Sequence, residues 1–322
     1  MNIYDKIFIT GHKGMVGSSF LKILKNKGYK NLYFIDKKKL DLRDQKKVNN
    51  YFKKPKPDIV IICSAKVGGI HANNSFSYDF IRDNLLIQTN LIQTSYQYKT
   101  KKVLFLGSSC IYPKNSKQPM TEEMMLGGYL EKTNEQYSIA KLAGIKLCEG
   151  LMRQFGNKKN VDFRSVIPPN LFGDNDNYHE LNSHVIASLI RKIKIAKKNK
   201  NRNIVIWGDG TPKRELMHVD DLVINLIKIL KLSKKTYWKN FTHTNSHLNT
   251  GSGYEISIID LAKMICKILD YFPKIKLDKK MPNGVKRKIM SNIKIKKILK
   301  SYKPYTKKIF YEKLKIIVEN YN

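Results

Sequence analysis

Apolar and polar residues alternate in blocks along the first half of the chain. Short, mostly apolar runs at residues 6–10, 31–35, 58–63 and 102–106 predict strands, and a further strand is predicted at 162–167. Between them lie segments with the spacing of amphipathic helices, ending at residue 27, including 48–52, and covering 80–98 and 134–155. Strands that are apolar throughout are typical of a parallel sheet with helices on both faces. The pattern predicts an α/β fold, a Rossmann-type doubly wound parallel sheet, over residues 1–167.

After Pro168 the loops lengthen and the apolar runs become fewer. Helices are predicted at residues 183–198, 219–232 and 258–269, one strand at 204–207, and a basic tail at the end. The helix at 219–232 resembles those of the first half. We therefore predict a smaller mixed α/β domain made of residues 168–215 and 250–322, with residues 216–249 returning to the first domain.

Composition adds an excess of positive charge to this picture. The chain has 322 residues, 61 of them Lys or Arg against 26 Asp or Glu, and a formal net charge of +35. Such an excess fits nucleic acid, an anionic membrane surface or a small anionic substrate. The lysines are scattered rather than gathered into one arm. The charge therefore indicates no particular partner, and we expect neither nucleic acid nor a membrane.

The four cysteines, Cys63, Cys110, Cys148 and Cys266, lie far apart and form no CxxC pair. This spacing argues against a zinc site or a disulfide framework, and we expect no bound metal. No apolar run approaches the ~20 residues that span a bilayer, and the first strand begins too early to leave room for a signal peptide. These features predict a cytoplasmic protein.

A glycine-rich loop, GHKGMVG, joins the first predicted strand to the first helix. Gly11 permits a tight turn, Gly14 lets the backbone approach a diphosphate, and Gly17 lets helix and strand pack closely. The helix N-terminus adds partial positive charge. Because the motif follows the first strand of a βαβ pattern, it predicts a dinucleotide site. Its GxxGxxG spacing is that of short-chain dehydrogenases.

Different residues of the sequence favour NADP and NAD. Asp36, at the end of the second strand, stands where an acid binds the 2′-hydroxyl of NAD. Lysines in the loop and after the second strand favour the 2′-phosphate of NADP: Lys13, Lys37, Lys38 and Lys39. We expect NADP(H), with NAD(H) not excluded.

Ser108, Tyr137 and Lys141 form a candidate site for hydride transfer. Tyr137 and Lys141 stand four apart on a predicted helix and therefore share a face. Ser108 follows an apolar strand, at the sheet edge where such folds bind ligands. A ketone that accepts hydride needs a proton, which Tyr137 can donate, while Ser108 holds the carbonyl oxygen. We expect the Lys141 ammonium to lower the pKa of the Tyr137 phenol from its usual value near ~10.

Cys110 and His184 suggest a second kind of chemistry at the same ketone. Cys110 lies two residues after Ser108, and His184 begins a helix of the second domain. Protons beside a carbonyl are acidic when the enolate is stabilised at the oxygen. Inverting such a carbon needs one group on each face, and Cys and His have pKa values close enough to neutrality to exchange protons.

Six segments together resemble one family of extended short-chain dehydrogenases, the GDP-L-fucose synthases. The segments are GHKGMVGS, AKVGGIHANN, FLGSSCIYPK, EQYSIAKLAGIKLCE, NSHVI and WGDGTPKRELMHVDD. The resemblance implies that Cys110 and His184 epimerise carbons 3 and 5 of GDP-4-keto-6-deoxy-D-mannose. Ser108, Tyr137 and Lys141 would then direct the NADPH-dependent reduction at carbon 4. It further implies a homodimer and a substrate-binding role for the second domain.

The same resemblance assigns the binding residues. The GDP-sugar would contact Lys192, Trp207, Arg214 and Asn283. The cofactor would contact four chain segments and two single residues: Gly11, His12, Lys13, Gly14, Met15, Val16 and Gly17; Lys37, Lys38, Lys39, Leu40, Asp41 and Leu42; Leu106, Gly107, Ser108 and Ser109; Pro168, Pro169, Asn170 and Leu171; and Lys141 and His184.

The chain departs from the family pattern at four of these positions. Lys13 and Lys37 stand where the family has arginines, which keeps the charge but not the two-pronged geometry. Pro169 replaces a threonine and Asn283 an aspartate.

Three other functions are consistent with parts of the sequence. The first is the same chemistry on another GDP-keto-sugar, of the colitose or heptose type. The second is a reductase that no longer epimerises, against which both Cys110 and His184 speak. The third is a non-catalytic protein that binds nucleotides or nucleic acid, against which the intact Ser108, Tyr137 and Lys141 set speaks.

Overall fold

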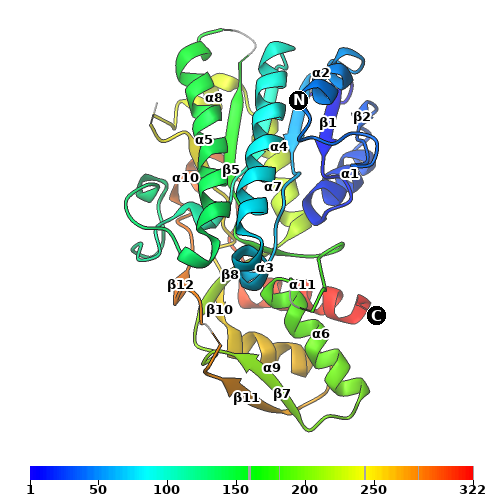
Figure 1. Ribbon diagram of the computed structural model, residues 1–322, viewed down its shortest axis with the longest axis vertical. Coiled ribbons are helices and arrows are strands. Elements are labelled where there is room, and N and C mark those ends of the chain that lie inside the picture. Colours follow the sequence, from blue (N-terminus) through cyan, green and yellow to red (C-terminus); the bar gives the residue numbers. More distant parts are fainter. Residues whose placement is uncertain (159–160, 181, 243, 282, 322) are drawn as a thin grey trace.

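The computed structural model describes residues 1–158, 161–180, 182–242, 244–281 and 283–321. Its upper lobe is built on a six-stranded sheet in which every pairing is parallel, in the order β2-β1-β3-β4-β5-β9 (Figure 1). This confirms the predicted doubly wound α/β fold. The strands are β1 (Ile7–Thr10), β2 (Leu32–Tyr33), β3 (Ile59–Ile62), β4 (Lys102–Leu106), β5 (Phe163–Ile167) and β9 (His247–Asn249).

Successive residues of each strand supply the two faces of the sheet. Ile7 and Ile9 belong to the core on one face, and Phe8 to the core on the other. The first face is covered by α1 (Met15–Asn26), α7 (Val219–Lys231), α8 (Lys234–Trp238) and α10 (Ile293–Ile298). The second is covered by α2 (Gln45–Lys53), α4 (Ser77–Gln97) and α5 (Glu135–Phe155). Because both faces are buried, the central strands β1, β3 and β4 are apolar along most of their length.

The chain leaves this lobe after β5 and later returns to it. Helix α7 packs against α1, and the Ser19 hydroxyl donates to Asp220 at 2.6 Å. Strand β9 then pairs with β5, with Ser165 opposite His247. The edge of the sheet is thus closed by residues that lie far along the sequence.

The lower lobe contains the remaining segments of the second half (Figure 1). Its helices are α6 (Val185–Lys198), α9 (Ile258–Ile268) and α11 (Lys307–Asn320). Strands β7 (Asn203–Trp207) and β11 (Lys274–Asp278) pair in parallel. Strand β8 (Lys213–His218) pairs with β6 (Asn170–Phe172), β10 (Glu255–Ser257) and β12 (Arg287–Lys288). Phe172, Leu261 and Phe310 lie in the core of this lobe.

The segment predicted only as a basic tail is largely helical. Its residues form α10 and α11, and α11 buries Phe310, Leu314 and Val318 at the four-residue spacing of one helix face. The many lysines between these positions hid the apolar stripe. Strand β2 is also shorter than the predicted 31–35, as an edge strand with one neighbour. Within the described residues, no helix is both long and apolar enough to cross a membrane.

Candidate active site

A cavity of about 960 Å³ lies at the carboxyl ends of the sheet strands, where the second lobe meets the first. Its walls include Gly11 after β1 and Ser64 after β3, the strands between which the chain direction across the sheet reverses. Open α/β sheets bind ligands at this point. Apart from Lys38 and Lys39, every residue predicted to contact cofactor or substrate lines the cavity.

The glycine loop has the shape that a dinucleotide diphosphate needs. Gly11 has a φ of +67°, and a side chain there would meet the Ser64 backbone nitrogen at 2.9 Å. A Cβ on Gly17 would lie 2.2 Å from the Gly11 carbonyl oxygen. Helix α1 begins at Met15, and no side chain caps its first turn. The N–H groups of that turn are therefore available to phosphate oxygens.

The residues that bear on cofactor choice form an ion-pair cluster at the end of β2. The Asp36 carboxylate lies 2.7 Å from Lys13 Nζ and 3.3 Å from His12 Nε2. The hydrogen bond from Lys13 lowers the pKa of Asp36. Lys37 lines the cavity, whereas Lys38 and Lys39 face solvent.

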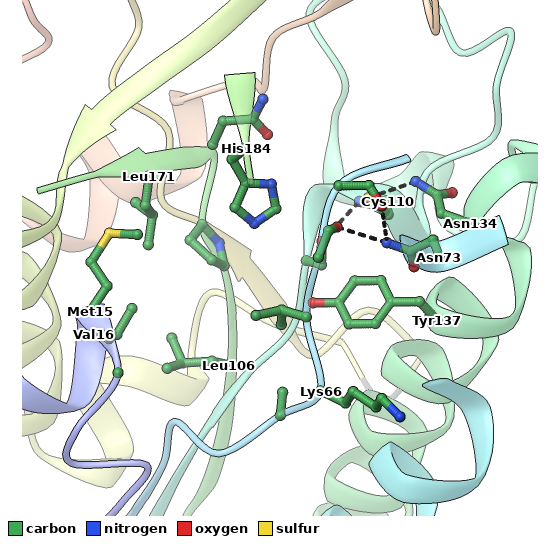
Figure 2. Close-up of a pocket in the computed structure, with 18 of the residues that line it drawn as sticks. Met15, Val16, Lys66, Asn73, Leu106, Cys110, Asn134, Tyr137, Leu171 and His184 are labelled. Atoms are coloured by element: carbon green, nitrogen blue, oxygen red, sulfur yellow. Dashed lines mark hydrogen bonds between the residues drawn. The ribbon is translucent and has the colours of Figure 1, made fainter. Parts of the chain in front are cut away.

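Ser108 and Tyr137 meet at the centre of the cavity. Ser108 lies two residues after the end of β4 and caps the short helix η1 (Ser109–Ile111), accepting from the Cys110 backbone N–H at 3.3 Å. Tyr137 lies in the first turn of α5, with its ring edge-on to Phe80 at 6.2 Å between centroids. Figure 2 shows its hydroxyl pointing into the cavity. Burial raises the pKa of Tyr137, a nearby Cys110 charge raises it further, and a hydrogen bond with Ser108 opposes both.

Lys141 lies one turn further along α5 and faces the end of β4. Its ammonium donates to the Leu106 carbonyl at 2.8 Å and lies 5.9 Å from the centre of the Tyr137 ring. Burial lowers the pKa of Lys141 to about 8. In this arrangement Lys141 does not lower the pKa of Tyr137 as expected, because its ammonium is directed at a carbonyl and burial dominates the phenol.

Cys110 and His184 face the same space from different lobes, above the Tyr137 hydroxyl (Figure 2). Cys110 lies in η1, and His184 is the residue at which α6 begins. Burial alone would raise the pKa of the Cys110 thiol, but Lys288, Ser108 and Arg214 outweigh it and lower that pKa. Burial within the cleft lowers the pKa of His184. Two groups that exchange protons near neutrality therefore face one point.

Two polar neighbours of Cys110 were missed by sequence reasoning. Asn134 Nδ2 and Lys288 Nζ each lie 3.3 Å from Cys110 Sγ. Asn134 precedes α5 and stands three residues before Tyr137, a spacing that could have drawn attention to it. Lys288 is 178 residues away in the chain, and one lysine among so many gave no signal.

The residues predicted to bind the GDP portion line the far end of the cavity. Lys192 Nζ lies 5.2 Å from the centre of the Trp207 ring, a cation–π contact between α6 and β7. Arg214 donates to the Val285 carbonyl at 2.6 Å. Asn283 Oδ1 accepts from the Asp209 N–H at 2.8 Å and so fixes the turn after β7. This end combines an aromatic face with cations, as a nucleoside diphosphate requires.

The fold and this site define a nucleotide-sugar enzyme of the dehydrogenase type. Residues 7–238 match the model of the NAD dependent epimerase/dehydratase family, and the chain belongs to that family. It is 43% identical to the GDP-L-fucose synthase of Escherichia coli (strain K12) over 286 residues, covering 89% of this chain and 88% of that protein. The predicted resemblance to GDP-L-fucose synthases is thereby confirmed.

Two further comparisons agree. The chain is 37% identical to the GDP-L-colitose synthase of Yersinia pseudotuberculosis over 289 residues, covering 89% of each. It superposes on a crystal structure of a GDP-L-fucose synthetase from Naegleria fowleri bound to NADP with a TM-score of 0.86 and 26% identity, covering 99% of this chain and 94% of that one.

Proposed function

We propose that the protein converts GDP-4-keto-6-deoxy-D-mannose to GDP-L-fucose by 3,5-epimerisation followed by NADPH-dependent reduction at carbon 4. The observation that carries this proposal is the meeting of Cys110 and His184 with Ser108 and Tyr137 in one cavity. A reductase alone needs only the second pair. The choice of substrate rests on the similarity to relatives that bear the name GDP-L-fucose synthase.

Epimerisation begins with the ketone at carbon 4 held near Ser108 and Tyr137. Carbons 3 and 5 flank this carbonyl, so a proton removed from either leaves an enolate whose charge lies on the held oxygen. Cys110 and His184 approach from η1 and α6, on different walls of the cavity. One removes the proton and the other delivers a proton to the opposite face, which inverts the carbon.

In the reduction, Ser108 and Tyr137 hold the same carbonyl oxygen at carbon 4. NADP(H) supplies the hydride when it is bound, and the glycine loop with Lys13 would hold it. The Tyr137 hydroxyl then gives its proton to the carbonyl oxygen, and Ser108 keeps that oxygen in place. Arg214 suits the diphosphate because its planar guanidinium can donate to two oxygens.

The direct test is to incubate purified protein with GDP-4-keto-6-deoxy-D-mannose and NADPH, following absorbance and the product by NMR. Formation of GDP-L-fucose supports the proposal. Cofactor binding without turnover would refute this substrate, and a GDP-keto-sugar of the colitose type would be assayed next because of the similarity to the colitose synthase.

Replacing Lys13 with alanine should weaken the use of NADPH more than that of NADH. The 2′-phosphate needs a cation, and Lys13 is the loop cation that reaches Asp36. A charge-assisted hydrogen bond contributes about 1.5–3 kcal/mol, so we expect KM for NADPH to rise roughly 10- to 100-fold. Steady-state kinetics with both cofactors measure this. Lys38→Ala, outside the cavity, is the matched control; an equal loss with both cofactors would contradict the assignment.

We further propose that the protein is a homodimer through α4 and α5, which lie side by side (Figure 1). Leu86 on α4 and Ile139 and Leu147 on α5 are exposed although apolar. Light scattering should give twice the chain mass, and Leu86→Glu with Ile139→Glu should give a monomer. Ile316→Glu on α11, an apolar position that is at least as exposed, should leave the dimer intact. A wild-type monomer would refute the proposal.

A further inference from the structure

The inference concerns how Cys110 is made ready for proton transfer, and it rests on the proposed function. Cys110 Sγ lies 3.3 Å from Lys288 Nζ and 3.3 Å from Asn134 Nδ2. Both neighbours are hydrogen-bond donors, and one carries a full positive charge. The sulfur of a neutral thiol is a weak hydrogen-bond acceptor, whereas a thiolate accepts strongly from both donors.

Lys288 is held in place from two directions. As part of β12 it pairs with β8, opposite Arg214. The residues that follow it bond to the first lobe, where the Ile289 N–H donates to Gln118 Oε1 at 2.9 Å and the Met120 N–H donates to the Ile289 carbonyl at 2.8 Å. The backbone of Lys288 is therefore held by pairing with β8 and, one residue later, by bonds to the first lobe, and its ammonium lies against Cys110 Sγ.

A buried carboxylate completes this support. Glu215, on β8, is 2% exposed and accepts from the Met290 N–H at 2.9 Å and the Gly253 N–H at 2.7 Å. It joins the strand that carries Lys288 to the neighbouring loop. The segment that carries Lys288 is therefore held by β8, through strand pairing and through Glu215, and by residues 118–120.

The other charged or titratable groups around Cys110 do not replace this lysine. Arg214 faces the thiol from β8 but donates to the Val285 carbonyl. Tyr137 faces it from α5 and is a neutral phenol below its raised pKa. His184 faces it from α6 across the cavity (Figure 2), and burial, which disfavours the charged imidazolium, lowers its pKa. Glu131 lines the same cavity and is paired with Lys114 at 3.3 Å.

We propose that Lys288 is a positioning residue for the epimerisation, whose ammonium keeps the Cys110 side chain as the thiolate that accepts the substrate proton. In that step the substrate C–H bond breaks and an S–H bond forms. The electron pair of the broken bond moves onto the carbonyl oxygen as an enolate. Lys288 stays protonated throughout and exchanges no proton with the substrate. Cys110 is then the group that begins as the base, and His184 is the proton donor.

The test measures the thiol directly, without any sugar substrate. The rate at which iodoacetamide alkylates Cys110 is followed against pH in the wild-type protein, with peptide mass spectrometry to identify the modified cysteine. In Lys288→Met the midpoint should rise by about 1 to 3 pH units, the effect of losing an adjacent opposite charge. Lys288→Arg keeps the charge and should restore a midpoint close to wild type.

Lys286→Met is the matched control. It removes the same charge at a position two residues before Lys288, and the Lys286 side chain lies outside the active-site cavity. Its midpoint should stay at the wild-type value. An unchanged midpoint in Lys288→Met, or an equal shift in Lys286→Met, overturns the proposal. Solvent-deuterium exchange at carbons 3 and 5 should slow in Lys288→Met in proportion to the lost thiolate. If wild type failed to turn over the GDP-sugar, the proposed function would fall while the thiol titration still decided the role of Lys288.

Discussion

Replacing Tyr137 with phenylalanine should reduce NADPH-dependent reduction by about 10²- to 10⁴-fold, the usual contribution of a positioned proton donor. The substitution removes one oxygen and leaves the ring against Phe80. The shape of the cavity and cofactor binding should therefore stay the same. Single-turnover NADPH oxidation measures the loss, and quenching of protein fluorescence by NADPH measures cofactor binding.

The control for this variant is Tyr129→Phe, which removes the same atom from a side chain that is 93% exposed. Its turnover should match wild type. Near-normal reduction in Tyr137→Phe would remove that tyrosine from the proton-donor role and move attention to Ser108, the other hydroxyl at the carbonyl.

Replacing Cys110 with serine should slow epimerisation by about 10²- to 10⁴-fold while hydride transfer changes far less. A serine hydroxyl has almost no anionic form near neutral pH, even beside Lys288, so it cannot accept a proton from carbon. Solvent-deuterium exchange at carbons 3 and 5, followed by NMR, reports epimerisation separately from NADPH oxidation.

Cys266→Ser serves as the comparison, because Cys266 is packed in the core of the second lobe. Its exchange rate per folded molecule should equal that of wild type. If deuterium entered carbons 3 and 5 at the wild-type rate in Cys110→Ser, Cys110 would not be the proton acceptor, and the role given to Lys288 would fall with it.

Much of the fold could be predicted because its signal is local. Strands such as β1 and β3 are buried along their whole length, so each appears as an unbroken apolar run. The glycine loop follows from steric demands that the structure reproduces at Gly11 and Gly17. The five residues expected to do chemistry lie near strand ends or helix starts, where sequence motifs carry information about position.

Other features depend on contacts that no local pattern records. Lys288 reaches Cys110 through the pairing of β12 with β8, which joins distant parts of the chain. The direction of the Lys141 side chain is set by the Leu106 carbonyl and by burial, not by its spacing from Tyr137. Helix α11 escaped prediction because its apolar stripe is interleaved with lysines.

The closure of the sheet by β9 has a consequence for synthesis of the protein on the ribosome. Until residues 247–249 emerge, β5 has an unpaired edge. All five residues of this strand are buried in the folded protein. An open strand edge can pair with a strand of another chain. Chains grow at about 5–20 residues per second. The edge of β5 therefore stays unpaired for several seconds while the residues between β5 and β9 are made. Chaperone demand should therefore peak before β9 is made and fall once it docks.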